Sequence, residues 1–214
     1  MRYETPETIG EAVSLLAIAE GSGRVLAGGT DLLVQLRSGV VEPGVVVDIK
    51  KIAETREITA ENGGFRVGAA VTGAELDEHK ALKKLWPGVV EAVELIGSTQ
   101  IQGRASMGGN LCNASPAADS VPALIAAGAL CHIAGLDGER TLPVEGFCTG
   151  PGMTNLKSGE FLVSFTLPSR PPYSGDAYLR FIPRTEMDIA VVGVGVSLTL
   201  DSNGNCILAR VGLG

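Results

Sequence analysis

The chain has 214 residues and a formal net charge of −7, with 17 lysine and arginine residues against 24 aspartate and glutamate residues. Hydrophobic residues make up 45%, which excludes a disordered protein, and the acidic balance argues against binding to nucleic acid, which needs basic side chains to neutralise phosphates. Glycine is in excess, with 29 residues where average usage of roughly 7% would give about 15. These glycines have no three-residue period, which excludes collagen.

The start of the chain has no apolar signal-peptide region, and no apolar run reaches the roughly 18 residues that span a bilayer. We therefore expect a cytoplasmic protein without a transmembrane segment. The four cysteines, Cys112, Cys131, Cys148 and Cys206, form no C-x-x-C pair. Their spacing argues against a zinc or iron–sulfur site within this chain, and we expect reduced, mostly buried thiols.

The first fifty residues alternate between helix and strand patterns. Thr5-Pro6 is typical of a helix N-terminus, and Ile9, Val13 and Leu16 fall on one face of that helix. The next predicted elements are a strand at 24–26, a helix at about 32–38 and a buried strand at 45–49. This order predicts a small unit with parallel strand pairing.

The middle of the chain begins with a hairpin signal, Asn62-Gly63-Gly64, between two strand-like runs. Helices are predicted at about 73–79 and 88–96. From Gly97 to Asp119 no periodicity survives, and a structureless stretch of that length in a compact domain is usually functional.

The remaining segments predict a helix at 120–127, strands at 130–134, 140–143 and 161–167, a linker at 168–172, and strands at 177–181, 191–200 and 206–211. The part that begins at about residue 173 contains too few elements to bury its own sheet. We expect the sequence to be truncated there, or a partner to complete the domain.

Two glycine loops are the main functional signal. Loop one is Ala27–Asp31, between a strand and a helix, and loop two is Ser106–Asn110. Glycines let backbone N–H groups approach an anion closely, so two such loops suit a diphosphate-containing ligand that bridges two lobes.

Neither loop is a common phosphate motif. No G-x-G-x-x-G follows a strand, and Gly109-Asn110 stands where a P-loop requires Lys-Ser/Thr. Two alternatives stay open: each loop taken alone could be an ordinary tight turn, and Asp31 could be a helix-capping carboxylate.

At these residues the chain resembles a known family, the FAD-binding (medium) subunits of molybdenum hydroxylases of the carbon monoxide dehydrogenase and xanthine dehydrogenase type. The resemblance is carried by four segments in the family's order: Leu26–Leu32, Ala105–Asn110, Asn113–Asp119 and Arg184–Ala190. Each short loop alone is unspecific, but the four together span nearly the whole chain.

The resemblance implies an α+β fold, with a two-lobed FAD-binding domain of the vanillyl-alcohol-oxidase type followed by the start of a C-terminal α+β domain. The implied boundaries are lobe one at 1–55, lobe two at 56–170 and a partial C-terminal domain at 171–214.

The same resemblance implies which residues bind FAD. Loop one and its flanks would wrap the diphosphate, loop two would hold the other side of the cofactor, and Ile96 and Thr99 would approach the flavin. Arg180 stands where many relatives have lysine, so its contact could differ in geometry. The expected cofactor-binding residues are Val25, Leu26, Ala27, Gly28, Gly29, Thr30, Asp31, Leu32, Ile96, Thr99, Ser106, Gly108, Gly109, Asn110, Asp119, Leu162 and Arg180.

Some features of relatives are missing. The four-cysteine cluster loop of the 4-hydroxybenzoyl-CoA reductase type has no counterpart here. The two histidines, His79 and His132, lie outside both glycine loops and are expected to be structural, so FAD should be bound non-covalently.

No catalytic acid–base pair, nucleophile or metal-ligand set can be read from the chain, which fits a subunit whose chemistry belongs to its cofactor. The resemblance implies a large molybdopterin partner and a small partner with [2Fe–2S] clusters, with FAD passing electrons to NAD⁺, oxygen or a quinone. Two other hypotheses remain: a stand-alone FAD-dependent oxidase or reductase, and a non-catalytic nucleotide-binding module.

Overall fold

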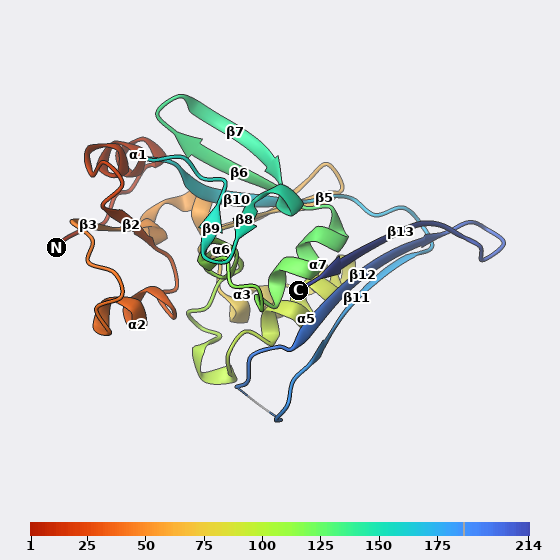
Figure 1. Ribbon diagram of the computed structural model, residues 1–214. Coiled ribbons are helices and arrows are strands. Elements are labelled where there is room, and N and C mark those ends of the chain that lie inside the picture. The colour runs from red at the N-terminus through yellow and green to blue at the C-terminus, as the bar shows by residue number, and fades with distance from the viewer. Residues whose placement is uncertain (186) are drawn as a thin grey trace.

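The computed structural model describes residues 1–185 and 187–214, so Glu186, within the fourth resemblance segment, lies outside the described residues. The described chain forms three main sheets that follow one another along the sequence (Figure 1). No helix in these ranges is long and apolar enough to cross a membrane.

The first sheet has three parallel strands in the order β1 (Arg2–Glu4), β3 (Val45–Asp48) and β2 (Gly23–Leu26). The parallel pairing predicted for this unit is confirmed. Strand β1 was not predicted, because Arg2-Tyr3-Glu4 is too short and too polar to show a strand pattern.

Helix α1 (Ile9–Ile18) connects β1 to β2, and helix α2 (Leu32–Arg37) lies between β2 and β3 in the chain. The predicted start of α1 at Thr5-Pro6 is wrong. Thr8 is the N-cap, because its side chain accepts the N–H of Glu11 at 3.2 Å while the Glu11 carboxylate accepts the N–H of Thr8. This reciprocal capping box outweighs the weaker signal of a proline at the first helical position.

The second sheet has five antiparallel strands, in the spatial order β4 (Ile58–Glu61), β5 (Gly64–Gly68), β10 (Phe161–Leu167), β6 (Leu130–Gly135) and β7 (Gly138–Pro143). The hairpin predicted at Asn62-Gly63-Gly64 is confirmed. Its two turn residues, Asn62 and Gly63, have the positive φ that such a turn needs.

Five helices cover one side of this sheet and share its larger hydrophobic core (Figure 1). They are α3 (Gly73–Glu78), α4 (Lys80–Leu85), α5 (Pro87–Glu94), α6 (Met107–Asn113) and α7 (Ser120–Ala127). The bounds predicted for α7 are confirmed. A further hairpin, β8 (Cys148–Gly150) and β9 (Met153–Thr154), was not predicted.

The prediction of a structureless stretch from Gly97 to Asp119 is wrong, because α6 lies within it. This helix was not predicted because its sequence, Met-Gly-Gly-Asn-Leu-Cys-Asn, has no helical repeat of apolar residues. Gly108 is nevertheless required by packing: a Cβ there would overlap the backbone of Ala69. The small residues let α6 lie against the segment that follows β5.

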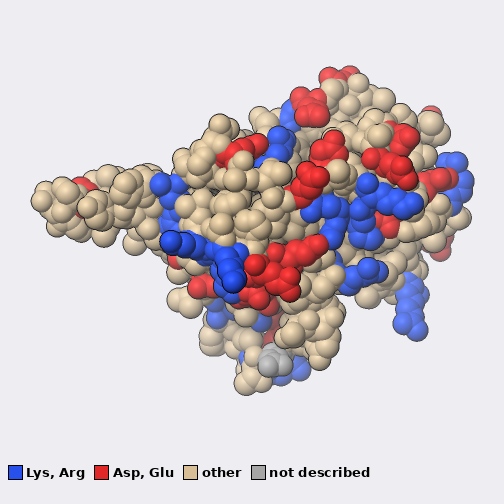
Figure 2. Space-filling model, turned by 180° about the vertical axis from the view of Figure 1, so that it is seen from behind, with Lys and Arg blue, Asp and Glu red and all other residues tan. Residues whose placement is uncertain are grey.

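The third sheet, β11 (Ser174–Phe181), β12 (Val192–Leu200) and β13 (Cys206–Leu213), extends away from the body as a curved antiparallel arm (Figure 1). One face of this sheet packs on α5 and α7, so two helices of the second lobe cover that face. The other face carries exposed apolar side chains such as Leu179, Phe181 and Leu213. Seen from behind, the projecting end is largely uncharged (Figure 2).

The contact between this sheet and α7 yields a test of packing. A Cβ on Gly195 would lie 2.5 Å from the carbonyl carbon of Pro122. Gly195→Val should therefore lower the free energy of unfolding by about 1–3 kcal/mol through overpacking, measured by urea denaturation. Gly175→Val is the matched control in the same sheet, because a Cβ there meets nothing within 4 Å. Equal stability of the two variants would contradict this packing.

Candidate functional site

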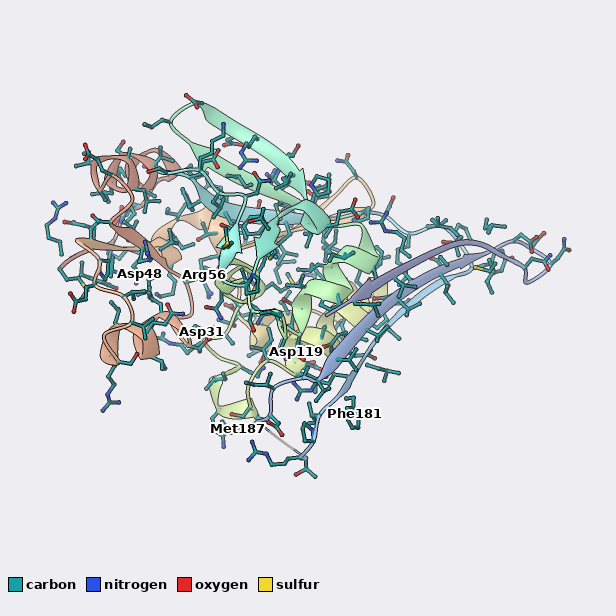
Figure 3. The ribbon with its side chains drawn as sticks, in the orientation of Figure 1. Asp31, Asp48, Arg56, Asp119, Phe181 and Met187 are labelled. Carbon is teal, nitrogen blue, oxygen red and sulfur yellow. The ribbon has the colours of Figure 1, made fainter. Side chains whose placement is uncertain are left out.

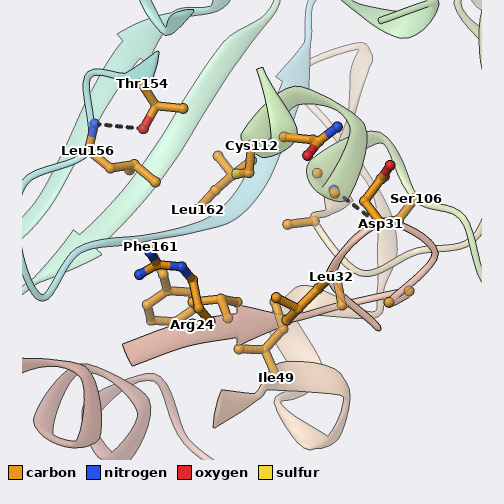
Figure 4. A pocket seen from close by; sticks show the side chains of 18 of the residues that line it. Arg24, Asp31, Leu32, Ile49, Ser106, Cys112, Thr154, Leu156, Phe161 and Leu162 are labelled. Carbon is orange, nitrogen blue, oxygen red and sulfur yellow. Dashed lines mark hydrogen bonds between the residues drawn. The ribbon is translucent and has the colours of Figure 1, made fainter. Parts of the chain in front are cut away.

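A cavity of about 600 Å³ lies where the first lobe meets the second (Figure 4). This volume is within the roughly 300–1,000 Å³ that is usual for small-molecule sites. Its walls combine loop one, loop two, strand β10 and the segment 152–160. The two glycine loops, about eighty residues apart in sequence, thus line one cavity.

Loop one leaves β2 and enters α2. Gly29 has φ +81, in the left-handed region that favours glycine. Among the described residues, none accepts a hydrogen bond from the backbone N–H of Gly28, Gly29, Thr30 or Asp31. The loop therefore contributes several unpaired backbone donors to the cavity wall, a composition suited to an anionic ligand.

The backbone of loop one also touches the segment that leads into loop two. A Cβ on Gly28 would overlap the carbonyl oxygen of Arg104, two residues before Ser106. Farther along, Gln35 of α2 donates a hydrogen bond to the Asn113 side chain of α6 at 3.1 Å. These contacts hold the two lobes together beside the cavity.

Loop two forms the first turn of α6. The Ser106 hydroxyl accepts the N–H of Gly109 at 3.1 Å, which makes Ser106 the N-cap. A Cβ on Gly109 would meet only that hydroxyl, at 3.2 Å, so this glycine leaves open space on the cavity side. The Asn110 side-chain oxygen accepts from both the N–H and the hydroxyl of Ser120, at 3.1 and 2.6 Å, which orients its amide.

Most of the predicted binding residues line this cavity. They are Val25, Ala27, Gly28, Gly29, Thr30, Asp31, Leu32, Ile96, Ser106, Gly108, Gly109, Asn110 and Leu162. Four predicted residues are not part of its lining: Leu26, Thr99, Asp119 and Arg180.

Asp119 and Arg180 instead form a buried ion pair. The Arg180 Nη1 atom lies 3.0 Å from Asp119 Oδ2 and also donates to the Leu95 carbonyl at 2.9 Å. The Tyr178 hydroxyl donates to Asp119 at 2.9 Å. Burial raises the pKa of Asp119, against the lowering effect of Tyr178 and Arg180. Arg180 of β11 is thus joined to Asp119, the N-cap residue of α7, and to the end of α5 directly before Ile96.

Asp31 lies within loop one, apart from this pair (Figure 3). It occupies the N-cap position of α2, but its side chain makes no capping hydrogen bond. The capping alternative is therefore wrong for Asp31. Asp31 is exposed to solvent, and partial desolvation by the surrounding chain raises the pKa of its carboxyl.

One wall of the cavity consists of residues that the sequence did not predict. This wall contains Gly152, Thr154, Leu156, Lys157, Ser158, Gly159 and Glu160. Arg140 fastens the segment to β7 through a two-pronged ion pair with Glu160, at 2.8 Å for each contact. No local pattern marked these residues, because the segment acquires its role only where the tertiary structure brings it to the same cavity as loop one and β10.

The remaining reactive side chains have structural surroundings. His79 Nδ1 accepts the N–H of Leu82 at 3.1 Å, and His132 hydrogen bonds to Thr166 at 2.7 Å. Cys112 lines the cavity, but burial raises the pKa of its thiol to about 12. Within the described ranges no group of three or more His, Cys, Asp or Glu side chains could hold a metal ion.

The buried ion pair gives a stability prediction. Arg180→Met should cost about 3–5 kcal/mol of unfolding free energy, because it leaves the Asp119 carboxylate buried without its cation. Urea denaturation followed by circular dichroism measures this loss. Arg184→Met, which breaks an exposed pair with Asp188, is the control and should leave the midpoint unchanged. Indistinguishable variants would contradict the importance of the buried pair.

Comparison with known proteins gives a consistent result. A family model described as the FAD binding domain in molybdopterin dehydrogenase matches residues 1–170. The xanthine dehydrogenase FAD-binding subunit of Escherichia coli O157:H7 is 36% identical over 214 residues, which cover 99% of this chain and 73% of that protein. The carbon monoxide dehydrogenase medium chain of Hydrogenophaga pseudoflava is 31% identical over 201 residues, covering 94% of this chain and 70% of that one.

Solved structures of related enzymes match the fold of this chain. A carbon monoxide dehydrogenase from Hydrogenophaga pseudoflava that lacks the Mo-pyranopterin moiety of its cofactor matches with a TM-score of 0.94 and 30% identity, covering 100% of this chain and 74% of that one. Quinoline 2-oxidoreductase from Pseudomonas putida 86 matches with a TM-score of 0.90 and 28% identity, covering 100% and 73%. The predicted α+β fold class is confirmed.

Proposed function

This chain belongs to the family of FAD-binding domains of molybdopterin dehydrogenases, and on that premise we propose that it carries electrons through FAD within a heteromeric molybdenum hydroxylase. The family consists of oxidoreductase subunits, as the names of the xanthine dehydrogenase and carbon monoxide dehydrogenase relatives indicate. FAD is the cofactor of this family, and its non-covalent attachment here is part of the proposal.

The observation that carries the proposal is the single cavity between two glycine loops from different lobes. The residues of this cavity fit FAD in two respects. Loop one has unpaired N–H donors for a diphosphate, and Gly109 leaves the space that a side chain would fill. When bound, FAD supplies the redox chemistry that the side chains of this site lack.

The proposed roles follow the positions in the cavity. Loop one would hold the diphosphate through its backbone N–H groups, and Ser106, Gly108, Gly109 and Asn110 would hold the opposite side. Ile96 would face the flavin. Leu26, Thr99, Asp119 and Arg180 stay predicted contacts, although they do not line the cavity. The bond from Arg180 to the Leu95 carbonyl supports a further role in fixing the backbone next to Ile96.

The proposal extends to partners and to domain boundaries. A large molybdopterin subunit would oxidise the substrate, a small subunit with [2Fe–2S] clusters would deliver the electrons, and NAD⁺, oxygen or a quinone would accept them. The medium-chain name of the Hydrogenophaga relative supports such a division of labour. The three successive sheets support lobes at 1–55 and 56–170 and a further domain at 171–214.

A stand-alone flavin oxidase would need a side chain suited to proton transfer beside the flavin. Among the described residues, the acidic side chains that line the cavity are Asp31 in loop one and Glu160, which is already paired with Arg140. This lining favours a cofactor-holding subunit over an independent oxidase. Co-purification with large and small subunits from the native source would support that choice, whereas turnover by the isolated chain would contradict it.

The first prediction from this function concerns the spectrum. The purified protein, incubated with FAD and freed of excess by gel filtration, should show visible flavin absorption bands. Acid or heat denaturation should release all of the flavin into the supernatant, because attachment is non-covalent. A colourless protein after incubation would contradict FAD binding and would favour a non-catalytic module.

Gly109 provides a test of the loop-two assignment. Gly109→Val should abolish FAD binding in a fluorescence titration, because the added side chain would occupy the cofactor's space, while the melting temperature of the protein without FAD changes little. Gly103→Val is the matched control, since Gly103 lies in the approach to loop two, does not line the cavity and has nothing within 4 Å of its Cβ position. Normal FAD affinity in the Gly109 variant would show that the loop is wrongly assigned.

A further inference from the structure

Lys50 follows β3 in the first lobe and lies close to the start of loop one. Strands β2 and β3 end side by side, with Leu26 paired to Asp48. Loop one begins directly after Leu26, and Lys50 stands two residues after Asp48 in a short 3₁₀ helix, Ile49–Lys51. Lys50 is not among the residues that line the cavity, so it approaches loop one from outside.

The ammonium group of Lys50 makes two contacts. Its Nζ atom donates to the carbonyl oxygen of Ala27, the first residue of loop one, at 3.0 Å, and lies 2.8 Å from Asp48 Oδ1. The Lys50 side chain is 27% exposed, so these contacts are only partly screened by water.

Asp48 lies in the first lobe (Figure 3) and is itself held by hydrogen bonds from two residues. Its carboxylate accepts the backbone N–H of Lys50 at 3.0 Å and the Tyr3 hydroxyl of β1 at 2.5 Å. Burial opposes ionisation of this carboxyl, but the hydrogen bonds from Lys50 and Tyr3 outweigh it and hold the pKa of Asp48 below its ordinary value. Residues from or next to all three strands of the first sheet thus hold the Lys50 ammonium in place.

This arrangement affects what loop one presents to the cavity. A carbonyl oxygen turned toward a diphosphate would repel it, whereas the N–H groups of the following residues attract it. The Lys50 ammonium satisfies the Ala27 carbonyl, the first acceptor of loop one, while the backbone N–H groups of Gly28–Asp31 stay unpaired at the cavity. Its positive charge also lies behind a loop that contains no basic residue.

We propose that Lys50 is a positioning residue that sets loop one in its diphosphate-binding conformation, with Asp48 and Tyr3 as its support. This inference rests on the proposed function, because it takes FAD as the ligand of the cavity. It assigns a role to a residue outside both glycine loops.

The test compares FAD affinity, measured by fluorescence titration, in the full chain and three variants. Lys50→Met should weaken FAD binding at least about tenfold, since a hydrogen bond from a charged group is lost. Lys51→Met is the matched control: Lys51 is an exposed neighbour of the same charge, and its replacement should leave the affinity unchanged. Lys50→Arg keeps the charge and the donor and should recover much of the loss.

ADP serves as a second probe because it carries the diphosphate without the flavin. Its affinity, measured by competition with FAD, should fall in Lys50→Met by the same factor as that of FAD. Circular dichroism and thermal melting check the fold, and Lys50→Gln replaces Lys50→Met if that variant is unfolded.

Three results would overturn the inference: wild-type FAD affinity in the Lys50→Met variant, an equal loss in Lys51→Met, or a Lys50→Arg variant as weak as Lys50→Met. Failure of the wild-type protein to bind FAD would instead overturn the proposed function, so the two failures are distinguishable.

Discussion

The close approach of the Gly28 backbone to the Arg104 carbonyl is the constraint on which the site depends. Any side chain at position 28 would overlap that carbonyl. The contact joins loop one of the first lobe to the segment that leads into loop two of the second, and the Gln35–Asn113 hydrogen bond reinforces it. Because the lobes meet in this way, loop one with its unpaired N–H groups and the first turn of α6 line the same cavity.

Strand β10 packs against both lobes. It is buried on both faces: Leu162, Phe165 and Leu167 belong to the larger core, while Phe161 and Val163 belong to the core shared with the first lobe. Phe161 and Leu162 also line the cavity. One strand thus holds two cores and the floor of the site together, which explains why the cavity lies between the lobes rather than within either of them.

Much of this architecture could be predicted from local sequence signals. Alternating and continuous apolar runs predicted most strands, and the two glycine loops predicted residues that line one cavity. The two wrong predictions have different causes. Helix α1 begins after Thr8 rather than at Thr5-Pro6 because Thr8 and Glu11 form a capping box, a local signal. Helix α6 was not predicted because its glycines serve tertiary packing against Ala69. The wall at 152–160 and the anchor at Lys50 arise only when segments distant in sequence are brought together, so no local pattern could reveal them.

The central claim is that both glycine loops bind one FAD molecule together. Amide hydrogen exchange with and without FAD tests it most directly, because exchange reports on backbone N–H groups one segment at a time. Peptides that contain Gly28–Asp31 and peptides that contain Ser106–Asn110 should both become protected on addition of FAD, at the same FAD concentration. Protection of one loop alone, or of neither, would contradict the account.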